Sequence, residues 1–155
     1  MMLERPRWWR FVLVMCLALL GLIGYWPSPV DQPIQGEIAH ALLILHTHGL
    51  PGWINYGFVE ASANVALFVP VGLVALLAFP GKRWWQVAAL GFLASGFIEL
   101  GQQLFLHSRF ASPVDLITNT AGCAVGTLIT QFMIRSRQPI QSPPATAQIP
   151  IKSRA

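Results

Sequence analysis

Four long runs of apolar residues divide the chain, and they constrain its fold more than any other feature. The runs cover about residues 10–27, 62–80, 84–106 and 114–134, and Glu99 is the one charge well inside a run. At a rise of 1.5 Å per residue, each run is long enough to cross a hydrocarbon core about 30 Å thick. The sequence therefore predicts an all-α, polytopic membrane protein with four transmembrane helices.

The composition supports this class and excludes two others. Of the 155 residues, 54% are hydrophobic and 10% are charged, whereas a soluble domain normally carries about 25% charged residues. So few charges cannot solvate a globular surface, which excludes a soluble enzyme or a nucleic-acid-binding protein. So much apolar surface also excludes a disordered chain.

The first run has two possible interpretations. Basic residues precede it, as in a signal peptide. However, no small-residue cleavage site follows, and the run ends at Tyr25, Trp26 and Pro27. Trp8 and Trp9 stand at its other end, and aromatic residues at both ends are typical of a span anchored at two interfaces. We therefore predict an uncleaved first helix.

The basic residues predict the orientation of the spans. Nine of the ten fall on one side of the four runs: Arg5, Arg7, Arg10, Lys82, Arg83, Arg135, Arg137, Lys152 and Arg154. The positive-inside rule assigns that side to the cytoplasm, so we expect both termini inside. The net charge of +4 is thus interpreted as a topology signal, and no nucleic-acid partner is expected.

Two further segments complete the predicted organisation. Between the first two spans, Ile34, Ile38, Leu42 and Leu45 recur at helical spacing before Gly49, which predicts a short helix over about 34–48. It is too short to span, so it is expected at the outer interface or as a re-entrant segment. Residues 1–135 would form the membrane domain, and residues 136–155, rich in Pro, Gln, Ser and Ala, a disordered cytoplasmic tail.

Polar residues from three spans are expected to meet at the outer end. The third run proceeds outward, and Glu99 lies fifteen residues, about 22 Å, from its inner edge. The second and fourth runs proceed inward, which puts their polar residues at the same depth. Ionisable groups are costly in a membrane and are therefore functional candidates. The predicted ligand-binding residues are Asn64, Glu99, Gln102, Arg109, Asp115 and Asn119.

Structural roles are an alternative for each of these residues. Ser112 and Asp115 have the spacing of a capping box, with Pro113 at the first helical position, so Asp115 could serve only as a cap. Asn64 and Asn119 could be interhelical hydrogen-bond partners, and Glu99 could be paired internally, for instance with Arg109, to fix helix register. No metal site is predicted, because His40, His46, His48 and His107 lack ligand spacing.

Three motifs resemble a known family. Asn64 to Gly72 (NVALFVPVG) is similar to the N-x-x-x-F-x-P-x-G signature of the VanZ-like family, and Ser95 to Gln102 (SGFIELGQ) resembles its S-x-x-x-E-x-x-Q helix. Arg109 followed by Asp115 to Gly122 (DLITNTAG) resembles its R…D-x-x-x-N-T-x-G ending. The resemblance implies a small multi-pass protein of the bacterial cytoplasmic membrane. The founding member of that family is associated with resistance to the glycopeptide antibiotic teicoplanin.

Two functions of different class remain open from the sequence. In the first, a non-catalytic protein of the cell envelope binds a lipid headgroup or an amphiphile in the outer polar cluster. Its partners would be membrane lipids and possible lipid-linked envelope precursors or lipoglycopeptides. In the second, an intramembrane enzyme acts on a lipid-linked substrate, with Glu99 and Asp115 as acid and base. No nucleophile motif supports catalysis, and no cofactor is predicted.

Overall fold

The chain folds into helices throughout the part that can be described. The computed structural model describes residues 6–26, 31–106 and 112–136, and no strand occurs among them. Its elements are α1 (Pro6–Gly24), η1 (Gln32–Ile34), α2 (Gln35–Thr47), α3 (Tyr56–Ala78), α4 (Trp84–Phe105) and α5 (Pro113–Ser136). Helices α1, α3, α4 and α5 are each long and apolar enough to cross a membrane. The all-α prediction with four spanning helices is confirmed. Of the predicted tail, 136–155, Ser136 is the last residue of α5, and 137–155 lie outside the described residues.

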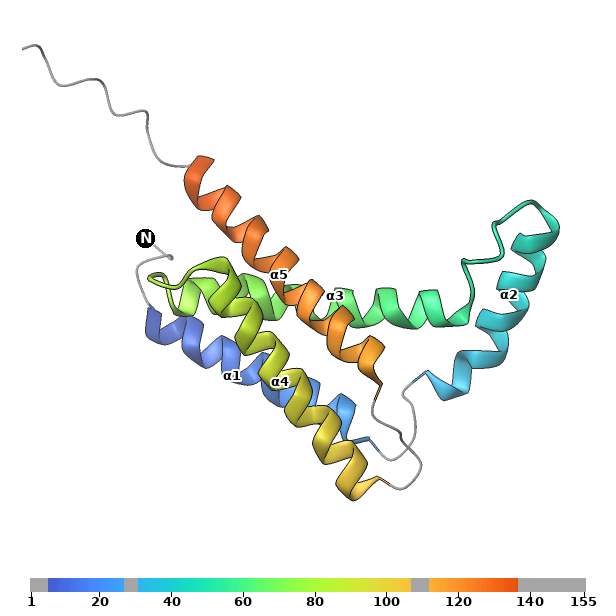
Figure 1. Ribbon diagram of the computed structural model, residues 1–155, viewed down its shortest axis with the longest axis horizontal. Helices are drawn as coiled ribbons and strands as arrows, with labels where there is room; N and C mark the ends of the chain where they lie inside the picture. Colours follow the sequence, from blue (N-terminus) through green and yellow to red (C-terminus); the bar gives the residue numbers. More distant parts are fainter. Residues whose placement is uncertain (1–5, 27–30, 107–111, 137–155) are drawn as a thin grey trace, which may run out of the picture.

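The four long helices form a bundle in which consecutive long helices run in opposite directions and α3 is central (Figure 1). Helix α3 packs most extensively on α5, and it also carries α1, while α4 packs mainly on α5. The start of α1, the turn from α3 to α4 and the end of α5 share one end of the bundle. This is called the basic end here, because it carries Arg7, Arg10, Lys82, Arg83 and Arg135. Which end faces the cytoplasm stays a prediction.

Glycines set the close approach of α3 and α5. A Cβ atom on Gly122 would overlap the carbonyl oxygen of Val65, and one on Gly126 would overlap that of Val69. A Cβ on Gly72 would likewise overlap the backbone of α5 at Cys123. Since the obstructing atoms belong to the backbone, larger residues could not be accommodated by a side-chain rotation. Small residues at these three positions therefore allow the α3–α5 contact.

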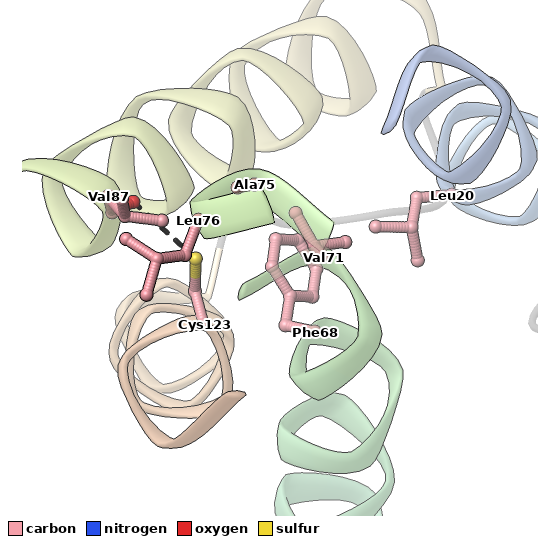
Figure 2. Close-up of a cluster of buried hydrophobic side chains, with 7 residues drawn as sticks. All are labelled: Leu20, Phe68, Val71, Ala75, Leu76, Val87 and Cys123. Carbon is pink, nitrogen blue, oxygen red and sulfur yellow. Dashed lines mark hydrogen bonds between the residues drawn. The ribbon is translucent and has the colours of Figure 1, made fainter. Parts of the chain in front are cut away.

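A small hydrophobic core lies where all four long helices meet (Figure 2). It consists of seven buried residues: Leu20, Phe68, Val71, Ala75, Leu76, Val87 and Cys123. The thiol of Cys123 donates to the carbonyl oxygen of Val87 at 3.5 Å. By contrast, Phe97, Phe105 and Phe132 on the outside of the bundle are each more than 70% exposed. Aromatic side chains of this exposure are unfavourable in water and suit contact with lipid.

Helix α2 confirms the short helix predicted between the first two spans. It ends where Gly49 adopts a positive φ of 97°. There the N–H of Gly49 bonds to His46 O, and the N–H of Leu50 bonds to Leu45 O, which is a Schellman ending. Helix α2 has no buried residue and touches only η1 and α3 among the described elements. It therefore stands beside the bundle, next to the start of α3 (Figure 1).

Helix α3 begins six residues earlier than its predicted span, at Tyr56. The side chain of Asn55 caps this helix by accepting a hydrogen bond from Phe58 N at 3.1 Å. Glu60, expected in the loop, is therefore in the first turns of α3. The hydroxyl of Tyr56 donates to Asp31 and accepts from Gln35 Nε2, which ties the start of α2 to the start of α3.

Candidate functional site

A polar cavity of about 100 Å³ lies between the four long helices, toward the end opposite the basic end. Five of the six predicted ligand-binding residues line it: Asn64, Glu99, Gln102, Asp115 and Asn119. The sixth, Arg109, lies outside the described residues. The structure thus brings together side chains from α3, α4 and α5 that are up to 55 positions apart in the sequence, from 64 to 119. Their role in binding a ligand stays a prediction.

Asp115 links the start of α5 to α3. Ser112 caps α5, because its Oγ accepts from the N–H of Asp115 at 3.3 Å. The predicted cap is therefore present. The carboxylate of Asp115 has a further contact, since its Oδ1 accepts from Asn64 Nδ2 at 2.8 Å. Asp115 thus does more than complete the first turn of its own helix.

Glu99 supplies the acceptor that a capping box normally takes from its own helix. In a capping box, the third helical residue accepts from the N–H of the cap residue. Here Glu99 Oε2, on α4, accepts from the N–H of Ser112 at 2.8 Å. The hydroxyl of Ser112 and the carboxylate of Glu99, which belong to different elements, therefore each satisfy one backbone N–H at the start of α5. This contact fixes α4 against α5, in agreement with the register role considered as an alternative.

Asn119 forms the most buried polar contact of the site. It is 9% exposed, and its Nδ2 donates to the Oγ of Ser95 on α4, which is 1% exposed, at 2.9 Å. In the sequence, Ser95 is distinguished only as the first residue of the S-x-x-x-E-x-x-Q motif. Its role as a hydrogen-bond acceptor was missed, because serine at a small-residue position has the same pattern whether or not the hydroxyl is used.

Gln102 connects the site to α1, which the sequence analysis had left out. Its Nε2 donates to the carbonyl oxygen of Gly24 at 2.8 Å, and Gly24 is the last residue of α1. The last four carbonyl groups of a helix lack partners within it, so Gln102 satisfies one of them. Leu20 and Ile23 of α1 also line the cavity. The general need of terminal helix carbonyl groups for outside donors was the available sequence signal.

The arrangement can recognise a small polar group beside an apolar wall. Carboxyl and amide groups face the cavity together with apolar side chains from three helices: Leu20, Ile23, Leu67, Phe68 and Ile98. Its volume of about 100 Å³ is well below the 300–1,000 Å³ of sites for drug-sized ligands. The described residues contain no group of three or more His, Cys, Asp or Glu that could hold a metal ion. The carboxyl and amide groups of the cavity can donate and accept hydrogen bonds.

Comparison with models of protein families identifies the chain. Residues 10–134 match the model described as VanZ/LLP1, from the first turns of α1 to the last turn of α5. The chain belongs to the VanZ/LLP1 family. The family resemblance seen in the three motifs is confirmed, and the VanZ/LLP1 match extends it over all four long helices and α2. The protein is thus a multi-pass membrane protein of the VanZ/LLP1 family.

Searches among curated proteins and solved structures found no match. For this VanZ/LLP1 protein, the site is therefore defined by its own geometry. Three residues of the N-x-x-x-F-x-P-x-G motif have visible roles: Asn64 lies in the cavity, Phe68 in the core and Gly72 at the α3–α5 contact. The motif combines a polar site residue with the packing that positions it.

Proposed function

We propose that this protein binds the headgroup of a membrane lipid or other amphiphile in the polar cavity, in the outer leaflet of the bacterial cytoplasmic membrane. The observation that carries the proposal is the convergence of five polar side chains from three helices on one cavity. Such groups are costly within a membrane. If these polar side chains served only as hydrogen-bond partners between helices, they could pack closely, and no cavity between them would be needed.

The size and chemistry of the cavity restrict the ligand. A volume of about 100 Å³ accommodates a phosphate, an ammonium or a hydroxylated group, with the apolar remainder of the amphiphile outside. Glu99 and Asp115 provide acceptor oxygens, which favours a headgroup with N–H or O–H donors. Arg109 in the following loop is the proposed partner for a phosphate, because its guanidinium can form two parallel hydrogen bonds.

Native mass spectrometry of the purified full-length protein tests this proposal. The protein would be mixed with phosphatidylethanolamine, phosphatidylglycerol or phosphatidylcholine of identical acyl chains, and bound lipid would be counted. We expect phosphatidylethanolamine, with its ammonium donors, to be retained best. Equal retention of all three lipids would contradict recognition of the headgroup.

Two charge-neutralising variants locate the binding. Glu99→Gln keeps an acceptor for the N–H of Ser112, and Asp115→Asn keeps one for Asn64, so both should remain folded. We expect each to reduce retention of phosphatidylethanolamine at least fivefold, with thermal stability close to that of the wild type. Glu60→Gln is the matched control, because Glu60 is an exposed carboxylate of α3 outside the cavity. Full retention in both cavity variants would mean that the polar cluster is structural.

The second candidate, an intramembrane enzyme, is favoured by one observation: Glu99 and Asp115 line the same cavity. Acid–base catalysis needs two such groups within reach of one substrate. Native mass spectrometry after incubation with a lipid-linked substrate separates the two functions. A bound lipid-linked substrate that changes mass on incubation with wild type, and remains unchanged with Glu99→Gln, would support catalysis over binding.

We also propose a link to teicoplanin resistance through this headgroup site. The cavity is too small to enclose a glycopeptide, so any effect on the antibiotic would follow from altered exposure of an envelope lipid. The test compares teicoplanin susceptibility of cells that express wild type or Glu99→Gln at equal membrane abundance. If both proteins protect the cells, or if neither does, teicoplanin resistance does not depend on the polar cavity.

A further inference from the structure

A second depression lies at the basic end of the bundle. Helices α1 and α5 both pack on α3 but not on each other within the described residues. Between them is a groove of about 320 Å³, with an entirely apolar surface, lined by Trp9, Leu73, Val74, Leu77, Thr130, Met133 and Ile134. Leu77 is the penultimate residue of α3, and Leu73 lies about 6 Å deeper at 1.5 Å per residue. The groove therefore extends over about one turn of α3, from the end of that helix toward its middle.

Trp9, which lines the groove, carries an unused hydrogen-bond donor. The indole Nε1 of Trp9 is buried and has no hydrogen-bond partner among the described residues. A buried donor without an acceptor is destabilising, and there is no water in a bilayer core to supply one. A rotation of the ring toward the groove would bring this N–H to an acceptor oxygen of a ligand bound there.

Exposed basic side chains lie at the same end of the bundle as the groove. Arg7 precedes Trp9 by two residues and Arg135 follows Ile134 directly, and both are exposed. Arg10 is held at the end of α3, where its Nε donates to Ala78 O at 3.3 Å and its guanidinium lies 5.2 Å from the centre of the Phe79 ring. That bond uses one of the five donors of the guanidinium. The positive charge at this end favours an anionic ligand.

We propose that this groove binds an anionic phospholipid: the upper part of one acyl chain lies along Leu73, Val74 and Leu77. The phosphate contacts Arg7 and Arg135, and an ester carbonyl accepts a hydrogen bond from Trp9. Basic pockets between transmembrane helices bind acidic headgroups in this way. This site is separate from the polar cavity at the opposite end.

Filling the groove tests the position of the lipid. The full-length protein in detergent would be titrated with phosphatidylglycerol and with phosphatidylcholine of the same acyl chains, and bound lipid measured by native mass spectrometry. Wild type should prefer phosphatidylglycerol, and Val74→Trp should abolish that preference. Val125→Trp is the matched control, because Val125 is 43% exposed on α5 and lies outside the groove. Loss in both tryptophan variants, or in neither, would overturn the proposal.

Two further variants test the polar contacts. Trp9→Phe keeps an aromatic ring and removes the N–H, and should weaken phosphatidylglycerol binding about three- to tenfold. Trp8→Phe is its control, since Trp8 is 56% exposed outside the groove. Replacing Arg7 and Arg135 by Gln should weaken binding about fivefold for each charge and leave phosphatidylcholine unaffected.

Other outcomes would identify a different occupant. A dimer that Val74→Trp converts to a monomer would assign the groove to a second copy and overturn the lipid proposal. Equal binding of the two lipids by wild type would overturn it as well. Glu60→Gln, at an exposed position of α3 outside both the cavity and the groove, should leave the preference for phosphatidylglycerol unchanged, and a loss there would also contradict the proposed location.

Discussion

The substitution Gly126→Ala should weaken the α3–α5 contact, because it adds a methyl group where the two helix backbones meet. An alanine Cβ there would overlap the carbonyl oxygen of Val69 and lie 2.8 Å from the backbone nitrogen of Leu73. Carbon and oxygen atoms in helix contacts are normally about 3.3–3.6 Å apart. Both obstructing groups are backbone, so Gly126→Ala requires α5 to move away from α3.

The expected change in the free energy of unfolding of Gly126→Ala is the sum of three contributions. Overpacking of a tight contact costs about 1–3 kcal/mol. Separation of the helices also weakens the bonds from Thr127 Oγ1 to Gly72 O (3.4 Å) and from Thr130 Oγ1 to Leu73 O (3.2 Å), and interhelical bonds in membranes average about 0.6 kcal/mol each. The higher helix propensity of alanine stabilises α5 by about 1 kcal/mol and offsets part of this loss. The free energy of unfolding should therefore fall by about 1–3 kcal/mol.

Reversible unfolding in mixed detergent–SDS micelles, followed by circular dichroism, measures this change. Gly21→Ala is the matched control, because a Cβ on Gly21 of α1 would have no heavy atom within 4 Å. It has the same gain in helix propensity without a clash, so its stability should equal or slightly exceed that of wild type. Equal stability of Gly126→Ala and Gly21→Ala would refute the close packing of α3 on α5 at this position.

Three other predictions concern topology, the end of α2 and the α3–α5 hydrogen bonds. With the native cysteines replaced by alanine, a cysteine at Gly36 should react with an impermeant maleimide from outside the cell and one at Gly81 should not; the reverse pattern would invert the orientation. Gly49→Ala forces a side chain into the left-handed region and should destabilise α2 by about 1 kcal/mol, seen as faster amide exchange in α2 alone. Thr127→Val should lower the free energy of unfolding by about 0.6 kcal/mol, and no change would show that its hydroxyl contributes only within α5.

Much of the site could be predicted because membrane topology limits the possible positions of a residue. Once the four apolar runs are accepted as antiparallel spans, the depth of Asn64, Glu99 and Asp115 follows from their distance along each helix. Depth does not specify which side chains meet. The pairing of Asn64 with Asp115 and of Glu99 with Ser112 depends on the rotation of each helix about its axis, which packing at Gly72 and Gly126 sets.

The sequence by itself determined the class of the protein, its four spanning helices, the short helix α2 and the end of the bundle at which its polar residues lie. These properties follow from hydropathy, helix rise and capping signals, which act locally along the chain. Only the tertiary structure decided that α1 closes the polar cavity through Gly24 and that α1 and α5 leave an apolar groove on α3. Such features depend on the distance between helices far apart in sequence, and the small residues and side-chain volumes at their contacts fix that distance collectively.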